Sequence, residues 1–158
     1  MISVFIADDH FVVRDGLKKI LSDESDIRVV GEASSSFEAV NLLKSLDCDI
    51  IILDISMPGK NGISSIPQIK AVNSKVKILI FSIFNEDKYV LSAFHKGASG
   101  FINKDSIAEE MVKAIKLILS GKKFLGSTIN KNILNELRDD SIIAFDNSTD
   151  ARCKPGLI

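Results

Sequence analysis

The sequence predicts a doubly wound α/β domain, with a five-stranded parallel sheet covered by helices on both faces. Two observations support this prediction. Short apolar runs rich in β-branched residues alternate with stretches whose apolar residues recur every three or four positions, and this happens five times between Ile2 and Leu119. Polar residues also follow the strand candidates at their carboxyl ends, where ligand sites lie in such sheets.

The first two strand–helix units occupy the start of the chain. Ile2 to Ala7 and Ile27 to Val30 are short apolar runs that favour strands. Each is followed by apolar residues at helical spacing, which predicts an amphipathic helix. The residues that mark these helices are Val13, Leu17, Ile20 and Leu21 in the first and Phe37, Val40, Leu43 and Leu46 in the second.

The third unit contains the most apolar strand candidate. Ile50 to Leu53 is continuously apolar and short, as expected of a strand buried on both faces. A turn is predicted at residues 58–62, which include Pro58, Gly59 and Gly62. Beyond this turn a helix is marked by Ile63, Ile66 and Ile69.

The last two units complete the predicted sheet. Lys77 to Phe81 is the fourth strand, and Gly97 is a suitable residue to end the helix after it. Gly100 to Asn103 is the fifth strand, and Ser106 can cap the fifth helix. Apolar positions mark the fourth helix at Val90, Leu91 and Phe94 and the fifth at Met111, Ala114, Ile115 and Ile118. Because crossovers are right-handed, few topologies remain, and we expect the flavodoxin-like strand order 2-1-3-4-5.

The pattern changes after Gly121, so we expect one domain over residues 1–121. Residues 122–138 read as a linker with a helix, marked by Ile129, Ile133, Leu134 and Leu137. Residues 139–158 are polar and aperiodic, and we expect a tail that is disordered or derived from the expression vector.

Composition excludes several classes of protein. The formal net charge of −1 over 158 residues provides no basic field for nucleic acid. The two cysteines are far apart and suggest neither a disulfide framework nor a zinc site. No apolar stretch is long enough to span a bilayer. We therefore expect a cytoplasmic domain with no membrane contact.

Five polar residues stand at the carboxyl ends of four predicted strands. They are Asp8 and Asp9 after the first strand, Asp54 after the third, Ser82 at the end of the fourth and Lys104 after the fifth. Three carboxylates in one cleft repel each other unless a cation neutralises them, and their hard oxygens suit Mg²⁺. With a lysine and a hydroxyl nearby, these groups supply what phosphoryl transfer needs.

The stretches IADDH, ILDISMPGKNG, ILIFS and KGASGFINKD resemble those of response-regulator receiver domains of the CheY type, in the same order over residues 2–120. KGASGFINKD and the helix expected after residue 126 are most similar to the NarL/FixJ group of two-component transcription regulators. All four motifs fall at matching strand ends, which makes the resemblance specific.

The resemblance implies a role for each residue at the edge. Asp54 is similar to the phosphoacceptor, and Mg²⁺ would be held by Asp8, Asp9, Asp54 and the backbone carbonyl of Ser56. Ser82 and Lys104 match the residues that bind the phosphoryl group. Phe101 matches the aromatic residue that reports the state of the domain, and phosphorylation would reshape the surface of the fourth helix, fifth strand and fifth helix.

The resemblance also implies partners. A sensor histidine kinase would supply the phosphoryl group, and a homodimer is possible. DNA would be contacted only through an effector domain that these residues do not contain, so the chain is either a fragment or a single-domain regulator. Ile83 and Phe84, which follow Ser82, are bulky or apolar where the attacking water would lie, so we expect slow self-dephosphorylation and no other enzyme activity.

Two alternative functions stay open. A haloacid-dehalogenase-like phosphatase also uses an aspartate nucleophile, but it needs a second aspartate at the position where Ser56 stands. A phosphorylation-independent interaction module with a relic site is the other alternative, and the complete set of site residues argues against it.

Overall fold

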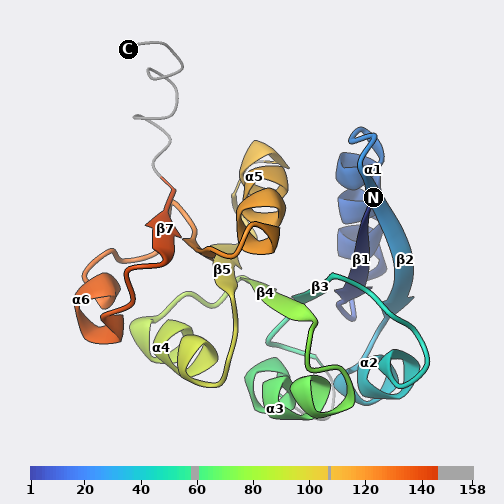
Figure 1. The fold of residues 1–158 in the computed structure, drawn as a ribbon, viewed down its shortest axis with the longest axis horizontal. Helices are drawn as coiled ribbons and strands as arrows, with labels where there is room; N and C mark the ends of the chain where they lie inside the picture. The colour runs from blue at the N-terminus through green and yellow to red at the C-terminus, as the bar shows by residue number, and fades with distance from the viewer. Residues whose placement is uncertain (58–60, 107, 146–158) are drawn as a thin grey trace.

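The protein forms one parallel sheet with helices on both faces (Figure 1), and the computed structural model describes residues 1–57, 61–106 and 108–145. The strands of the sheet are β1 Ile2–Ala7, β2 Ile27–Ala33, β3 Ile50–Leu53, β4 Lys77–Ser82, β5 Gly100–Asn103, β6 Lys123–Leu125 and β7 Ile142–Ala144. The helices are α1 Phe11–Ser22, α2 Ser36–Leu43, α3 Gly62–Val72, α4 Asp87–His95, α5 Ala108–Leu119 and α6 Ile133–Leu137. None of the described helices is long and apolar enough to cross a membrane.

The strand order is β2-β1-β3-β4-β5-β6-β7, and each neighbouring pair is parallel. The first five strands therefore have the expected order 2-1-3-4-5, which confirms the predicted fold. Strands β6 and β7 extend the sheet beyond β5, so the expected number of five strands is too small for the described chain.

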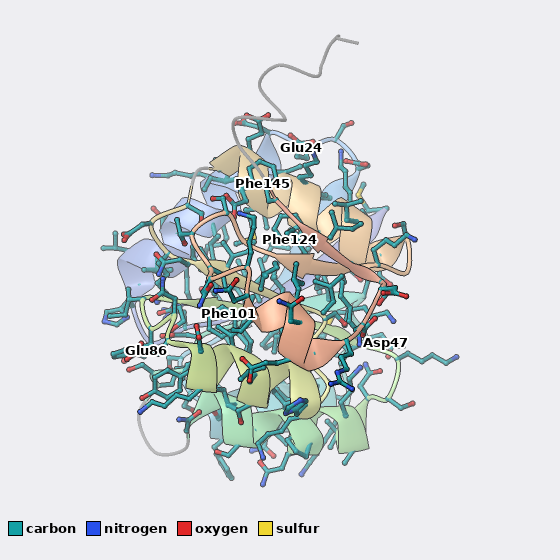
Figure 2. The ribbon with its side chains drawn as sticks, turned by 90° about the vertical axis from the view of Figure 1, so that its left-hand side faces the viewer. Glu24, Asp47, Glu86, Phe101, Phe124 and Phe145 are labelled. Carbon is teal, nitrogen blue, oxygen red and sulfur yellow. The ribbon has the colours of Figure 1, made fainter. Side chains whose placement is uncertain are left out.

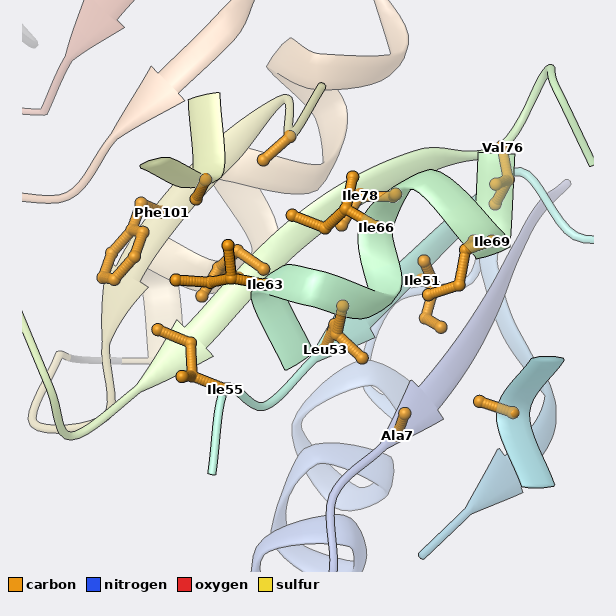
Figure 3. Close-up of a cluster of buried hydrophobic side chains, with 14 of the residues drawn as sticks. Ala7, Ile51, Leu53, Ile55, Ile63, Ile66, Ile69, Val76, Ile78 and Phe101 are labelled. Atoms are coloured by element: carbon orange, nitrogen blue, oxygen red, sulfur yellow. The ribbon is translucent and has the colours of Figure 1, made fainter. Parts of the chain in front are cut away.

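Two apolar clusters hold the layers together. Helices α1 and α5 lie on one face of the sheet and α2, α3 and α4 on the other (Figure 1). Because successive residues of a strand point to opposite faces, Ile51 and Leu53 of β3 join the α3 side while Ile50 and Ile52 join the α1–α5 side. Figure 3 shows the first cluster, in which Ile63, Ile66 and Ile69 of α3 lie over the sheet.

The C-terminal part of the chain differs from the expectation. The linker does contain a helix, α6, but it also contains β6, and residues 139–145 are not a separate tail. Strand β7 pairs with β6, and Phe145 is buried, with 3% of its surface exposed. Three-residue strands are too short for a periodic pattern, which is why the sequence concealed them. Residues 146–158 lie outside the described residues.

The sheet register places the carboxyl ends of the central strands side by side. Ala7 of β1 pairs with Leu53 of β3, and Leu53 pairs with Ile80 of β4. Ser82 pairs with Asn103 of β5. The winding direction of the chain reverses between β1 and β3, so the crevice at their carboxyl ends is the expected ligand position.

Candidate functional site

Three carboxylates meet at this crevice. Asp8 and Asp9 follow β1 and Asp54 follows β3, and the backbone N–H of Asp54 donates to the carbonyl of Ala7 at 2.9 Å. One ligand atom from each of Asp8, Asp9, His10 and Asp54 lies within 4.8 Å of all the others. Asp8 and Asp54 are each only 2% exposed. The sheet thus holds acidic groups in one small and largely buried space, as the sequence predicted.

Lys104 neutralises part of this charge. Its Nζ atom lies 2.7 Å from Oδ2 of Asp8 and 3.3 Å from Oδ2 of Asp54. Its backbone N–H donates to the carbonyl of Ser82 at 2.9 Å, which continues the pairing of β4 and β5 past the end of β5. The lysine is therefore placed by the sheet itself, and its charge links the first and third strands to the fifth.

The electrostatics of Asp54 fit a site that takes a cation. Burial and the nearby charge of Asp8 raise the pKa of the Asp54 carboxyl above its usual value, while Lys104 acts in the opposite direction. Oδ2 of Asp54 and Oδ1 of Asp9 are buried and form no hydrogen bond with any described residue, although Nζ of Lys104 lies 3.3 Å from the former and Nδ1 of His10 lies 3.0 Å from the latter. Buried anionic oxygens without hydrogen bonds are costly, and a small divalent ion would satisfy both.

Ser82 and Phe101 belong to the neighbouring strands β4 and β5. Ser82 is fully buried, and its Oγ accepts a hydrogen bond from the backbone N–H of Phe84 at 2.9 Å. Among the described residues, no hydrogen bond joins the Ser82 hydroxyl to Asp54 or to the Lys104 ammonium group. Phe101 is also fully buried and belongs to the cluster on the α3 side (Figure 3). Ser56 is exposed, and its backbone N–H donates to Oδ1 of Asp54 at 3.2 Å.

Two residues take part in the site beyond those that the sequence indicated. His10, which directly follows the acidic pair, has Nδ1 3.2 Å from Oδ1 of Asp8 and 3.0 Å from Oδ1 of Asp9. Arg14 donates from Nη1 to the carbonyl of Asp8 at 2.6 Å and from Nε to Glu32 at 2.8 Å. His10 directly precedes α1 and Arg14 lies in its first turn. Residues four positions apart lie on one face of a helix, and this spacing after Asp8 and Asp9 is the feature of the sequence that could have indicated both.

Comparisons with known proteins agree with this geometry. Residues 4–116 match the model of the family described as the response regulator receiver domain. The chain belongs to this family. The chain is 34% identical over 136 residues to the nitrate/nitrite response regulator protein NarL of Escherichia coli K12. The aligned region covers 86% of this chain and 63% of NarL. The chain is 35% identical to the response regulator UvrY of the same strain, over 82% of this chain and 59% of UvrY.

Solved structures show the same receiver fold. The match to a LuxR-family two-component response regulator from Aurantimonas sp. SI85-9A1 has a TM-score of 0.76 and 32% identity, and it covers 86% of this chain and 94% of that one. The isolated receiver of RcsB from Salmonella enterica serovar Typhimurium, solved in the presence of the phosphomimetic BeF₃⁻, matches with a TM-score of 0.74 and 29% identity, over 85% of this chain and 96% of that one.

These findings confirm the family that the four motifs indicated. The chain is a receiver domain of the two-component response-regulator type, related to NarL and UvrY. It spans less than two thirds of the length of these curated relatives.

Proposed function

We propose that this receiver accepts a phosphoryl group on Asp54 from a sensor histidine kinase, in a reaction that requires Mg²⁺. The observation that carries the proposal is the buried Asp54 carboxylate, which lies between two further acids and the Lys104 ammonium group. A cytoplasmic location is part of the proposal, since receivers of this family meet their kinases there.

The metal would be held by Asp8, Asp9, Asp54 and the backbone carbonyl of Ser56. The buried oxygens of Asp9 and Asp54 that form no hydrogen bond support this assignment. When bound, Mg²⁺ neutralises charge on the phosphoryl oxygens and on the acids around them. His10 contacts the same carboxylates from the exposed side and would limit access to them.

In the proposed step a carboxylate oxygen of Asp54 attacks phosphorus and forms an acyl phosphate. The phosphorus–nitrogen bond to the kinase histidine breaks, and its electron pair stays on the imidazole. The raised pKa of the Asp54 carboxyl disfavours the carboxylate form that attacks phosphorus. The positive charge of Lys104 acts against this increase and so favours the nucleophile before the reaction. Lys104 would then pair with the new phosphoryl oxygens.

The response would pass through Ser82 and Phe101. The Ser82 hydroxyl accepts a hydrogen bond from the Phe84 amide in the described state, and it would leave this amide to donate to a phosphoryl oxygen. Strands β4 and β5 would follow, and the surface formed by α4, β5 and α5 would change shape. Reversing a 99:1 preference takes about 5.5 kcal/mol, which a few charge-assisted hydrogen bonds can supply.

The output we propose is control of transcription in a longer protein. In that protein, DNA would be bound by an effector domain beyond the receiver, and phosphorylation would loosen contacts with it or favour a homodimer. One of the similar solved structures is of RcsB dimers bound to DNA, which supports this assignment. Enzyme turnover is not part of the proposal, because Ser56 stands where a phosphatase of the rival class needs an acid.

The proposal is tested with acetyl phosphate and Mg²⁺ on the whole chain. We expect the mass of one phosphoryl group to be added at Asp54, and we expect the addition to fail in Asp54→Asn and in excess EDTA. Asp47→Asn is the matched control, because Asp47 is exposed and precedes β3, whereas Asp54 follows it. A wild-type chain that gains no mass, or gains it at another residue, would overturn the proposal.

A further inference from the structure

The outer edge of β5 is covered by the chain itself. We call residues 122–145 the C-terminal segment; it contains β6, α6 and β7. Strand β6 pairs with β5, and β7 pairs with β6. Figure 2 looks onto this side of the molecule, where the segment crosses the sheet edge between α5 and α4. The segment therefore occupies the surface of α4, β5 and α5 that the proposed function would reshape.

Contacts at both ends hold the segment in place. On the α4 side, Nδ2 of Asn130 lies 3.1 Å from Oδ2 of Asp87, and Ile133 is fully buried. On the α5 side, the Phe145 ring packs against Phe124 with ring centroids 5.9 Å apart. The Phe145 backbone N–H also donates to the carbonyl of Leu125 at 2.8 Å.

The most unusual contact is made by Glu110, a fully buried acid in the first turn of α5. Its carboxylate accepts from the backbone N–H of Ser127 at 2.9 Å and from the Ser127 hydroxyl at 2.8 Å. No cation forms an ion pair with Glu110 among the described residues. A buried charge depends on its hydrogen bonds, so the position of Glu110 and that of Ser127 are tied together.

Glu110 also stands close to the loop that carries Lys104. The Ser106 hydroxyl donates to the Glu110 carboxylate at 3.4 Å, and the backbone N–H of Ser106 donates to the carbonyl of Asn103. Next to Ser127, the Gly126 backbone N–H donates to the carbonyl of Phe101 at 2.9 Å. The segment is therefore hydrogen-bonded to β5 and, through Glu110, to the turn between β5 and α5.

We propose that the C-terminal segment is an intramolecular cover of the α4–β5–α5 surface, that Glu110 is its positioning residue, and that phosphorylation loosens it. This inference rests on the proposed function, in which the Lys104 ammonium group exchanges its 2.7 Å pairing with Asp8 for the phosphoryl oxygens on Asp54. That movement shifts residues 103–106, draws Ser106 and the first turn of α5 with them, and weakens the hydrogen bonds between Glu110 and Ser127.

The test is hydrogen exchange measured by mass spectrometry on the whole chain, with and without acetyl phosphate and Mg²⁺. In the phosphorylated wild type, we expect peptides over residues 123–127 and 142–145 to exchange about tenfold faster, the size expected for loss of a hydrogen bond to a charged group. Peptides over β1 and β3 should keep their rates.

Substitutions separate the parts of the inference. Glu110→Gln should raise exchange in the same peptides before phosphorylation and leave little further change after it. Glu109→Gln, an exposed neighbour on the same helix, should behave as the wild type. Should Glu110→Gln fail to fold, Ser127→Ala removes one of the two bonds and should show the same change at smaller size.

The outcomes distinguish this inference from the proposed function. If Asp54 gains the phosphoryl mass but exchange over 123–127 and 142–145 is unchanged, the inference is wrong and the proposed function stands. If Glu110→Gln exchanges like Glu109→Gln, Glu110 does not position the segment. If no mass is added, both proposals fail together.

Discussion

At the scale of residues, position at the end of a strand decides what each aspartate can do. Asp54 is 2% exposed and lies within reach of Lys104, whereas Asp47 and Asp49, near the other end of β3, are exposed. Burial removes solvating water from Asp54, so its charge is balanced by Lys104 and, in the proposed function, by the bound Mg²⁺. An aspartate is therefore a surface charge before β3, at Asp47 and Asp49, and the proposed nucleophile after β3, at Asp54.

Phe84 gives a prediction about the lifetime of the phosphorylated state. It lines a hollow of about 250 Å³ with Ser56, Asn61 and Tyr89, and its ring centroid lies 6.1 Å from that of Tyr89. An apolar ring cannot orient an attacking water. We expect Phe84→Asn to speed phosphoryl loss on the order of tenfold, less than the ~10²-fold of a positioned acid or base, because an amide only orients the water.

The lifetime is measured by following the phosphoryl mass after removal of the phosphodonor. Phe37→Asn is the control, since Phe37 is an exposed ring on α2, away from the acidic groups. A wild-type half-life of seconds, or equal rates in the two variants, would show that Phe84 does not protect the acyl phosphate.

At the scale of elements, the start of α3 depends on one glycine. The Gly62 backbone N–H donates to the carbonyl of Ile55 at 2.8 Å, which joins the start of α3 to the residues that follow β3. A Cβ atom at Gly62 would lie 2.9 Å from Cα of Ile55 and would clash with the carbonyl oxygen of Asp54. This contact brings the start of α3 against the backbone of Asp54, the proposed phosphoacceptor, and only glycine permits so close an approach.

We therefore expect Gly62→Ala to lower the free energy of unfolding by about 1–3 kcal/mol, the usual cost of a forced backbone shift. Phosphorylation of Asp54 should also slow, since Asp54 would move. Gly16→Ala is the matched control: no atom lies within 4 Å of its added Cβ, and alanine in the middle of α1 should raise stability by about 0.5–1 kcal/mol.

Urea unfolding followed by circular dichroism measures both variants. If Gly62→Ala were as stable as the wild type and equally reactive, the turn would tolerate a side chain and our interpretation of this contact would be wrong.

At the scale of the whole molecule, the sheet continues past the five strands of the core. Phe145, at the far end of the chain that the structure describes, is packed by Phe124, and Nζ of Lys113 lies 5.2 Å from its ring centroid. The added strands therefore share the core formed by α5 and the sheet. We infer that, in the unphosphorylated protein, the C-terminal segment unfolds with the domain and not before it.

This inference predicts that Phe145→Ala lowers the free energy of unfolding by about 3–5 kcal/mol, as for other large-to-small changes in a core. Ile143→Ala, in β7 two residues before Phe145 and 38% exposed, should cost much less. Thermal and urea unfolding test both variants. Equal stability of the two would mean that the segment is only loosely attached.

The sequence by itself determined the five strand–helix units and the site edge. Apolar periodicity over elements of 4 to 12 residues shows the alternation of strands and helices, and it predicted the five core strands. Their order was predicted from the right-handed crossover rule and the common doubly wound topologies. Parallel strands end at a common edge, so Asp8, Asp54 and Lys104 had to meet once the order was known.

Only the tertiary structure decided what the end of the chain does. Strands β6 and β7 have three residues each, too few for a periodic signal, and pairing with a strand already in place determines them. The contact of Glu110 with Ser127 joins residues 17 positions apart, and nothing local marks it. Local pattern reports which face of an element is apolar, whereas the partner of each face is determined when the whole chain packs.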